Sequence, residues 1–165
     1  VTIMKVAAGL DTGDMLLKGE VEITPETTGG SLHDDLAKIG AELTIKVLKD
    51  WDNIVPEVQD DALSCYAAKL EKEESILNTE MTAEDLCRKI MAFNPYPAVY
   101  FEHKDERFKV LRAKVSNIEN QIGKIWQQGQ QLFIGAKDRA VEVTEIQRQG
   151  KKAMSVAELL RGYSF

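Results

Sequence analysis

Apolar and polar positions follow different periods along this chain. Near the start, the apolar stretch Val1 to Val6 and the segment from Met15 to Ile23 predict two strands on either side of a polar turn. Five apolar residues then recur at helical spacing: Leu32, Leu36, Ile39, Leu43 and Val47. Residues 32 to about 50 are therefore predicted to form an amphipathic helix. Ser31, with Asp34 three residues later, is a capping-box pattern that places the helix start there.

The pattern changes after residue 50. Residues 51–72 have no sustained period and are interpreted as a linker. Thr82 with Asp85 predicts a second helix start, and this helix should end before Asn94-Pro95, because proline disfavours a helical residue in front of it. Short alternating segments follow, at Ala98 to Glu102, Phe108 to Val115, Gly123 to Trp126, Gln131 to Ile134 and Ala140 to Ile146. They predict a five-strand meander or a small barrel with a lead helix.

These elements predict an α/β part followed by a mainly β part. Residues 1–50 contain too few strands for a covered sheet, because a layered fold needs both faces of the sheet packed. We therefore expect the later portion of a longer protein: residues 1–50 as the end of an α/β domain, 51–72 as an interdomain linker and 73–165 as an OB-like barrel. OB-type barrels often bind nucleic acid, which is an analogy of fold alone.

The hexamer Gly9-Leu10-Asp11-Thr12-Gly13-Asp14 follows the first predicted strand. Glycine lets backbone approach a ligand or adopt a positive φ, and a carboxylate held between glycines can accept a proton or orient another base. Such a loop is typical of an active site at the end of a strand. An ordinary Asx-type turn has the same composition, so the hexamer alone leaves both interpretations open.

The composition further restricts the class of protein to which the chain can belong. The 165 residues are 44% hydrophobic and 29% charged, with a net charge of -6, as in globular proteins of one large or two small domains. No run of about 18 apolar residues and no basic, apolar leader is present, so we expect no membrane segment and a cytoplasmic location. Cys65 and Cys87 have neither C-x-x-C spacing nor the density of a disulfide framework, which predicts two reduced thiols. Two cysteines and two distant histidines support no metal site.

The net charge hides an asymmetry. Residues 1–99 carry 9 Lys and Arg against 19 Asp and Glu, net -10, whereas residues 100–165 carry 12 against 8, net +4. A polyanion such as nucleic acid should prefer the basic end, because phosphates neutralised by Lys and Arg release counterions. Gly150 allows a tight turn that would project Lys151 and Lys152 together, ahead of a last short helix at Ser155. An ordinary solvated surface with a small positive excess is the alternative.

Five motifs taken together carry a resemblance to a known family. In chain order they are V-T-I-M-K-V-A-A-G-L-D-T-G-D-M-L, S-L-H-D-D-L, P-E-V-Q-D, F-N-P-Y-P and Q-G-K-K-A-M-S. Their order and spacing resemble the methionyl-tRNA formyltransferase family, from about its middle to near its C-terminus. The resemblance implies a Rossmann-like catalytic domain followed by an OB-like tRNA-binding domain. It also implies formyl transfer from 10-formyltetrahydrofolate to methionyl initiator tRNA in translation initiation, without a metal and by a monomer when complete.

The resemblance assigns Asp11 to the family's catalytic aspartate, which orients and electrostatically supports a histidine. The Asn and His partners have no match here, because His33 is expected in the first turn of a helix and His103 in a solvated turn. The chain alone is therefore expected to be inactive. The folate-lining segment of the family corresponds to Ala8, Gly9, Leu10, Thr12 and Gly13.

The same resemblance places contacts to tRNA phosphates on four lysines: Lys69, Lys72, Lys151 and Lys152. Two other functions remain open at this point. One is a related folate-dependent formyltransferase or hydrolase that acts on another amine or on water. The other is a non-catalytic fragment that binds RNA through its barrel.

Overall fold

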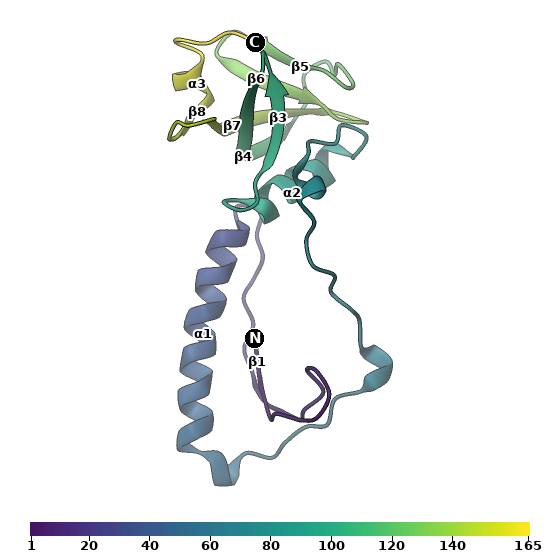
Figure 1. The fold of residues 1–165 in the computed structure, drawn as a ribbon, viewed down its shortest axis with the longest axis vertical. Coiled ribbons are helices and arrows are strands. Elements are labelled where there is room, and N and C mark those ends of the chain that lie inside the picture. Colours follow the sequence, from purple (N-terminus) through teal and green to yellow (C-terminus); the bar gives the residue numbers. More distant parts are fainter. The chain divides into compact units, whose positions relative to one another are not determined.

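The computed structural model describes all 165 residues, which form two compact units (Figure 1). Unit 1 comprises Val1–Thr24 and Ser31–Lys69, and unit 2 comprises Pro25–Gly30 and Leu70–Phe165. The strands are β1 Thr2–Met4, β2 Met15–Lys18, β3 Val99–His103, β4 Glu106–Ser116, β5 Ile125–Gln128, β6 Gln131–Gly135, β7 Ala140–Arg148 and β8 Ala153–Ser155. The α-helices are α1 Gly29–Lys49, α2 Ala83–Phe93 and α3 Val156–Leu159, with short 3-10 turns at Trp51–Asn53, Asp61–Leu63 and Lys72–Ser75. None of the helices is long and apolar enough to cross a membrane.

Unit 1 begins with an antiparallel pair of short strands. β1 pairs with β2 so that Ile3 lies opposite Leu17. The second strand was predicted to continue to Ile23, but it ends at Lys18. The Gly19 N–H donates to the Val1 carbonyl at 2.8 Å, and residues 19–24 form no strand.

The predicted amphipathic helix is present as α1, and its least exposed residues are Leu43 and Val47. The predicted cap at Ser31 is wrong, because α1 begins at Gly29 and Ser31 is its third residue. Contacts within unit 2 explain the earlier start. The Gly30 N–H donates to the Asn94 carbonyl at 2.8 Å, and a Cβ on Gly29 would lie 2.1 Å from the Ala92 carbonyl oxygen.

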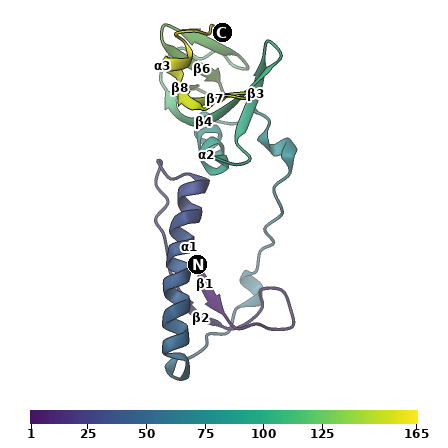
Figure 2. The ribbon, with the colours of Figure 1, turned by 60° about the vertical axis from the view of Figure 1, so that its left-hand side comes forward.

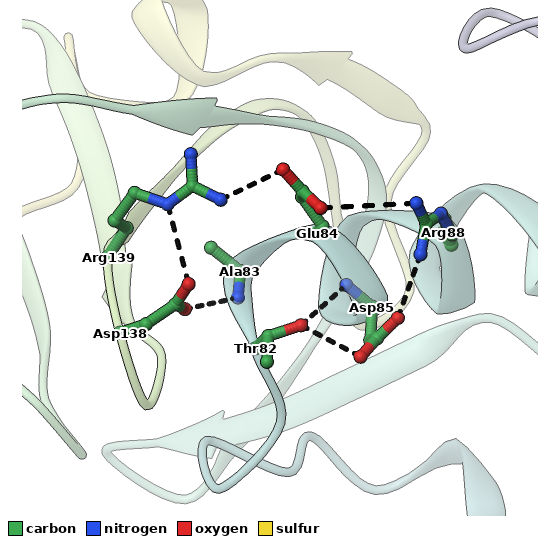
Figure 3. Close-up of polar contacts among 7 residues, drawn as sticks. All are labelled: Thr82, Ala83, Glu84, Asp85, Arg88, Asp138 and Arg139. Carbon is green, nitrogen blue, oxygen red and sulfur yellow. Dashed lines mark hydrogen bonds and ion pairs between the residues drawn. The ribbon is translucent and has the colours of Figure 1, made fainter.

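Helix α2 begins after Thr82, as predicted. The Thr82 hydroxyl accepts a hydrogen bond from the Asp85 N–H at 3.2 Å, and the Asp138 carboxylate accepts one from the Ala83 N–H at 2.7 Å. Each bond satisfies one of the free N–H groups of the first turn. The bond from Ala83, followed by the neighbouring Arg139, lowers the pKa of Asp138 below its ordinary value. Figure 3 shows this network together with Glu84 and Arg88.

Unit 2 contains a six-stranded antiparallel sheet in the order β3-β4-β7-β6-β5, with β8 paired to β7. All five predicted strands are present. Of the two predicted arrangements, the meander is wrong, because β4 pairs with β7 and not with the next strand along the chain, and the small barrel stays a prediction. The long connection from residue 117 to residue 124 allows this crossover, since only very short loops force consecutive strands to pair. Strand β8 was not predicted.

One face of the sheet packs against α2 to form the core of unit 2 (Figure 2). Leu86 and Ile90 of α2 are fully buried and belong to the same core cluster as Phe108, Val110 and Ile146. Burial of each such side chain stabilises the folded state by about 1.5–3 kcal/mol. The opposite face of β3 and β4 carries the alternating polar side chains of the same strands.

Candidate functional site

The hexamer noted above lies in the connection between β1 and β2, and residues 8–13 are here called the acidic loop. The Lys5 N–H donates to the Asp14 carbonyl at 2.9 Å and closes the base of this connection. Gly13 is buried, and a Cβ there would lie 1.7 Å from the Lys5 carbonyl oxygen, so only glycine fits. Asp11 has a φ of 54°, a left-handed conformation that Asp and Asn tolerate better than most residues.

Gln59 holds the acidic loop from 46 and 48 positions further along the chain. Its side-chain Nε2 donates to the Gly13 carbonyl at 2.7 Å and to the Asp11 carbonyl at 2.8 Å. Nearby, Met15 and Glu57 exchange two backbone hydrogen bonds of 2.8 Å, which fix the segment that carries Gln59. The loop is therefore ordered by the region interpreted as a linker. Gln59 lies in the motif P-E-V-Q-D, but its residue type alone does not distinguish it from a surface glutamine.

We expect Gln59→Leu to loosen the acidic loop without unfolding unit 1. Loss of two hydrogen bonds corresponds to about 1–3 kcal/mol of local stability, because each contributes about 0.5–1.5 kcal/mol. Hydrogen exchange at the Lys5 amide should accelerate by about 5- to 150-fold, as that free-energy change implies. Val58→Ala serves as the control, since Val58 is the exposed neighbour of Gln59. Equal exchange rates in the two variants would contradict this role.

The residues assigned to the folate segment lie together in the acidic loop. Ala8, Gly9, Leu10 and Thr12 are exposed, and the Thr12 hydroxyl donates to the Gly9 carbonyl at 3.1 Å. Leu10 and Asp11 form a turn in the middle of the loop. The Asp11 side chain is likewise exposed and forms no ion pair. The loop thus presents one carboxylate and a stretch of exposed residues.

The two histidines lie elsewhere. His33 is an exposed residue near the start of α1, and its Nδ1 lies 3.1 Å from an Asp34 carboxylate oxygen. The prediction of a solvated turn for His103 is wrong, because His103 ends β3 and packs against aromatic rings. The ring centroids of His103 and Phe165 are 4.9 Å apart, and its Nε2 is buried without a partner. The C-terminal residues that cover His103 could not be anticipated from its polar neighbours in sequence.

The four predicted lysines are all exposed. Lys151 and Lys152 lie side by side in the turn between β7 and β8, where Gly150 has a φ of 70°. The Gln147 side chain supports this turn by donating to the Lys151 carbonyl at 2.9 Å. Lys69 ends unit 1 and Lys72 begins a 3-10 turn of unit 2.

The remaining candidate chemistry is limited. No group of three or more His, Cys, Asp or Glu is arranged to hold a metal ion. Cys65 is exposed, whereas Cys87 lies on α2 and is partly buried. Burial raises the pKa of the Cys87 thiol to about 11, so this thiol stays protonated and unreactive near neutral pH.

Comparison with known proteins identifies the family. Residues 69–164 match the family described as "Formyl transferase, C-terminal domain", and residues 1–48 match the one described as "Formyl transferase". The chain belongs to the formyl transferase family. The resemblance drawn from the five motifs is therefore confirmed, and both parts of the family occur in the predicted order.

Formyl transferase relatives resemble the chain along almost its whole length. A methionyl-tRNA formyltransferase of Rickettsia bellii (strain RML369-C) is 37% identical over 163 residues, which is 99% of this chain and 54% of that protein. The chain thus spans about half the length of the curated relatives it matches. Among solved structures, HypX from Aquifex aeolicus in complex with tetrahydrofolic acid has a TM-score of 0.68 at 16% identity, over 96% of this chain and 29% of HypX. Methionyl-tRNA formyltransferase from Clostridium thermocellum has a TM-score of 0.56 at 20% identity, over 72% of this chain and 51% of that one. These two structures share the fold.

Proposed function

We propose that this chain contributes to transfer of a formyl group from 10-formyltetrahydrofolate to the amino group of methionyl initiator tRNA. The acidic loop is the observation that carries the proposal, because it combines an exposed carboxylate with ordered backbone in a chain of the formyl transferase family. The named relatives, which are methionyl-tRNA formyltransferases, support this acceptor. Such an acceptor fits a cytoplasmic enzyme of translation.

The acidic loop suits the folate donor. A pterin ring presents hydrogen-bonding groups along its edge, and sites for such rings combine apolar contact with a few placed polar groups. The exposed backbone of residues 8–12 can supply N–H donors, and Leu10, which is 89% exposed, supplies an apolar surface. Ala8, Gly9, Thr12 and Gly13 are small enough to let backbone approach the ring. HypX, which shares the fold, is described with bound tetrahydrofolic acid.

Asp11 has an electrostatic and positioning role in this proposal. When an amine attacks a formyl carbon, negative charge develops on the formyl oxygen and the amine must lose a proton. A carboxylate supports that proton transfer by orienting an imidazole and stabilising its protonated form. The Asn and His that share this chemistry in the family have no counterpart in these residues, so we expect the chain alone to be inactive.

The basic part of unit 2 is proposed to bind the tRNA. Lys151 and Lys152 project from one turn and form no ion pair, so both charges are available to phosphates. Lys69 and Lys72 are exposed cations of the connecting segment and are proposed as further phosphate contacts. Phosphate contacts of this kind position an RNA and do not read its sequence.

We expect the double variant Lys151→Ala, Lys152→Ala to bind methionyl initiator tRNA more weakly and with a smaller salt dependence. Each lost phosphate contact should lower the slope of log Kd against log salt concentration by about one. The measurement is a titration of the 165-residue chain with labelled tRNA at several salt concentrations. Lys38→Ala and Lys46→Ala on exposed positions of α1 provide a charge-matched control. If the slope of log Kd against log salt concentration is the same in the double variant and the parent, these lysines do not contact the tRNA phosphates.

Three finer structural points belong to the same proposal. Residues 1–50 are taken as the end of a Rossmann-like domain, 51–72 as the linker and 73–165 as an OB-like barrel domain. The six antiparallel strands of unit 2 and its helix α2 support the last point. On the family resemblance, the complete enzyme is proposed to act as a monomer without a metal.

A chimaera tests the function. This chain replaces the matched residues of the Rickettsia bellii relative, and formylation is measured with 10-formyltetrahydrofolate and methionyl initiator tRNA. We expect activity in the chimaera and none in the 165-residue chain. A folded chimaera that binds folate and formylates another amine, but not the tRNA, would favour the alternative of a related formyltransferase. Activity of the 165-residue chain by itself would overturn the assignment of the missing partners.

A further inference from the structure

Unit 2 has a second polar surface that none of the predicted site residues occupies. It lies on the face of the sheet opposite α2 and is formed by Tyr100, Glu102, Arg107, Lys109 and Gln147, here called the outer face. Antiparallel pairing aligns these side chains in rows across three strands. Tyr100 of β3 lies opposite Lys109 of β4, which in turn lies opposite Gln147 of β7. Alternation along each strand directs them away from the buried Phe101 and Phe108.

The outer face carries a preformed stack. The guanidinium carbon of Arg107 lies 4.0 Å from the centroid of the Tyr100 ring, a distance typical of a cation–π contact. Glu102 accepts a hydrogen bond from Arg107 at 3.3 Å and helps to fix its orientation. The Arg107 side chain keeps 47% of its surface exposed. One face of the guanidinium plane is thus covered by tyrosine while the side chain stays accessible to solvent.

Cations outnumber carboxylates around this stack. A concavity of about 560 Å³ lies beside it, and its charged lining residues are Glu102, Asp105, Arg107, Lys109 and Arg148. Glu106 neutralises Arg148 through two hydrogen bonds of 2.5 Å, and Glu102 is engaged by Arg107. Lys109 forms no ion pair, and Lys151 follows the concavity in the next turn. Asp105 has no ion pair and offsets one of these two lysines, so one positive charge stays uncompensated around the stack.

We propose that the outer face binds an unpaired segment of RNA, with a base stacked on Arg107 and the adjoining phosphates on Lys109, Lys151 and Lys152. This inference rests on the proposed function and adds where and in what form the RNA is held. Guanidinium planes and aromatic rings are the surfaces on which unstacked bases lie, whereas the bases of a duplex are not free to stack on a side chain. The pairing of Arg107 with Tyr100 therefore favours a single-stranded segment over a helix.

The test compares two RNAs on the full 165-residue chain: a blunt hairpin whose strands are joined by a linker without bases, and the same hairpin with an unpaired 3′ extension. The decisive variant is Arg107→Lys, which keeps the positive charge and removes the planar guanidinium on which a base could stack. We expect it to weaken binding of the extended hairpin by about 5-fold or more, in line with the loss of one stacked base, and to leave the blunt hairpin unchanged. Tyr100→Leu should act in the same direction, while Tyr100→Phe should bind as the parent chain does.

Lysine variants separate this inference from the proposed function. Lys109→Ala should weaken binding of both RNAs and lower the salt slope by about one, whereas Lys124→Ala, an exposed lysine before the far edge strand β5, should change neither. If Arg107→Lys binds the extended hairpin as tightly as the parent chain does, the stacking site is overturned and the tRNA proposal stands. If binding is weak and independent of salt for both RNAs, the tRNA proposal itself fails.

Discussion

Replacement of Asp11 by Asn in the active chimaera is expected to reduce the rate of formyl transfer by about 10²- to 10⁴-fold, the range for an acid-base group or its electrostatic support. Asparagine has the size of aspartate and also tolerates the φ of 54° at this position, so the loop should keep its shape. The loss should therefore appear in kcat, with little change in the KM for the folate donor. Single-turnover kinetics with saturating donor measure this directly.

Asp14→Asn is the matched control for that experiment. Asp14 belongs to the same connection and its backbone carbonyl accepts the hydrogen bond from Lys5, which the substitution leaves in place. Its side chain is outside the acidic loop, so the rate should remain close to that of the parent chimaera. Equal rates in the Asp11 and Asp14 variants would exclude a catalytic contribution from Asp11.

Gly135→Ala is expected to destabilise unit 2 by about 3 kcal/mol, at the upper end of the range for an overpacked core. Gly135 is a buried residue of β6, and a Cβ there would lie 1.8 Å from the carbonyl oxygen of Gln121. Relief requires a shift of backbone, because the obstructing atom is not part of a flexible side chain. Denaturant unfolding of the 165-residue chain, followed by the fluorescence of Trp126, measures the change.

Gly162→Ala is the control, because a Cβ at Gly162 would meet no atom within 4 Å. Its free energy of unfolding should differ from that of the parent by less than about 1 kcal/mol, since alanine at a compatible position acts mainly on the unfolded chain. An unfolding midpoint for Gly135→Ala that matches that of Gly162→Ala would show that β6 can move without cost.

The sequence was sufficient to predict an element where its first and last residues depend only on neighbouring residues. Helix α2 begins at Thr82 because the threonine hydroxyl binds an N–H three residues ahead, and it stops at Asn94 before a proline. Where the start of a helix or the partner of a strand depends on residues far away in the sequence, the pattern did not predict it. The start of α1 depends on the Asn94 carbonyl, and the partner of β4 depends on a crossover that alternation cannot specify.

The candidate site shows the same division. The glycines and Asp11 could be recognised as a loop beside a strand, since their types alone indicate an unusual backbone. Gln59 gave no such signal, because its role comes from two carbonyls nearly fifty residues earlier. The contact of Arg107 with Tyr100 could not be predicted from the sequence either, since it depends on the register of β3 with β4 and not on either residue type.

The pairing of β7 with three other strands also sets an order of assembly. β4 ends at Ser116, yet the strand that completes its ladder begins only at Ala140, and β8 joins that strand later still. During synthesis, one edge of β4 therefore stays unpaired until β7 has been made. An exposed strand edge can pair with other chains, so this interval is when unit 2 is most prone to aggregate.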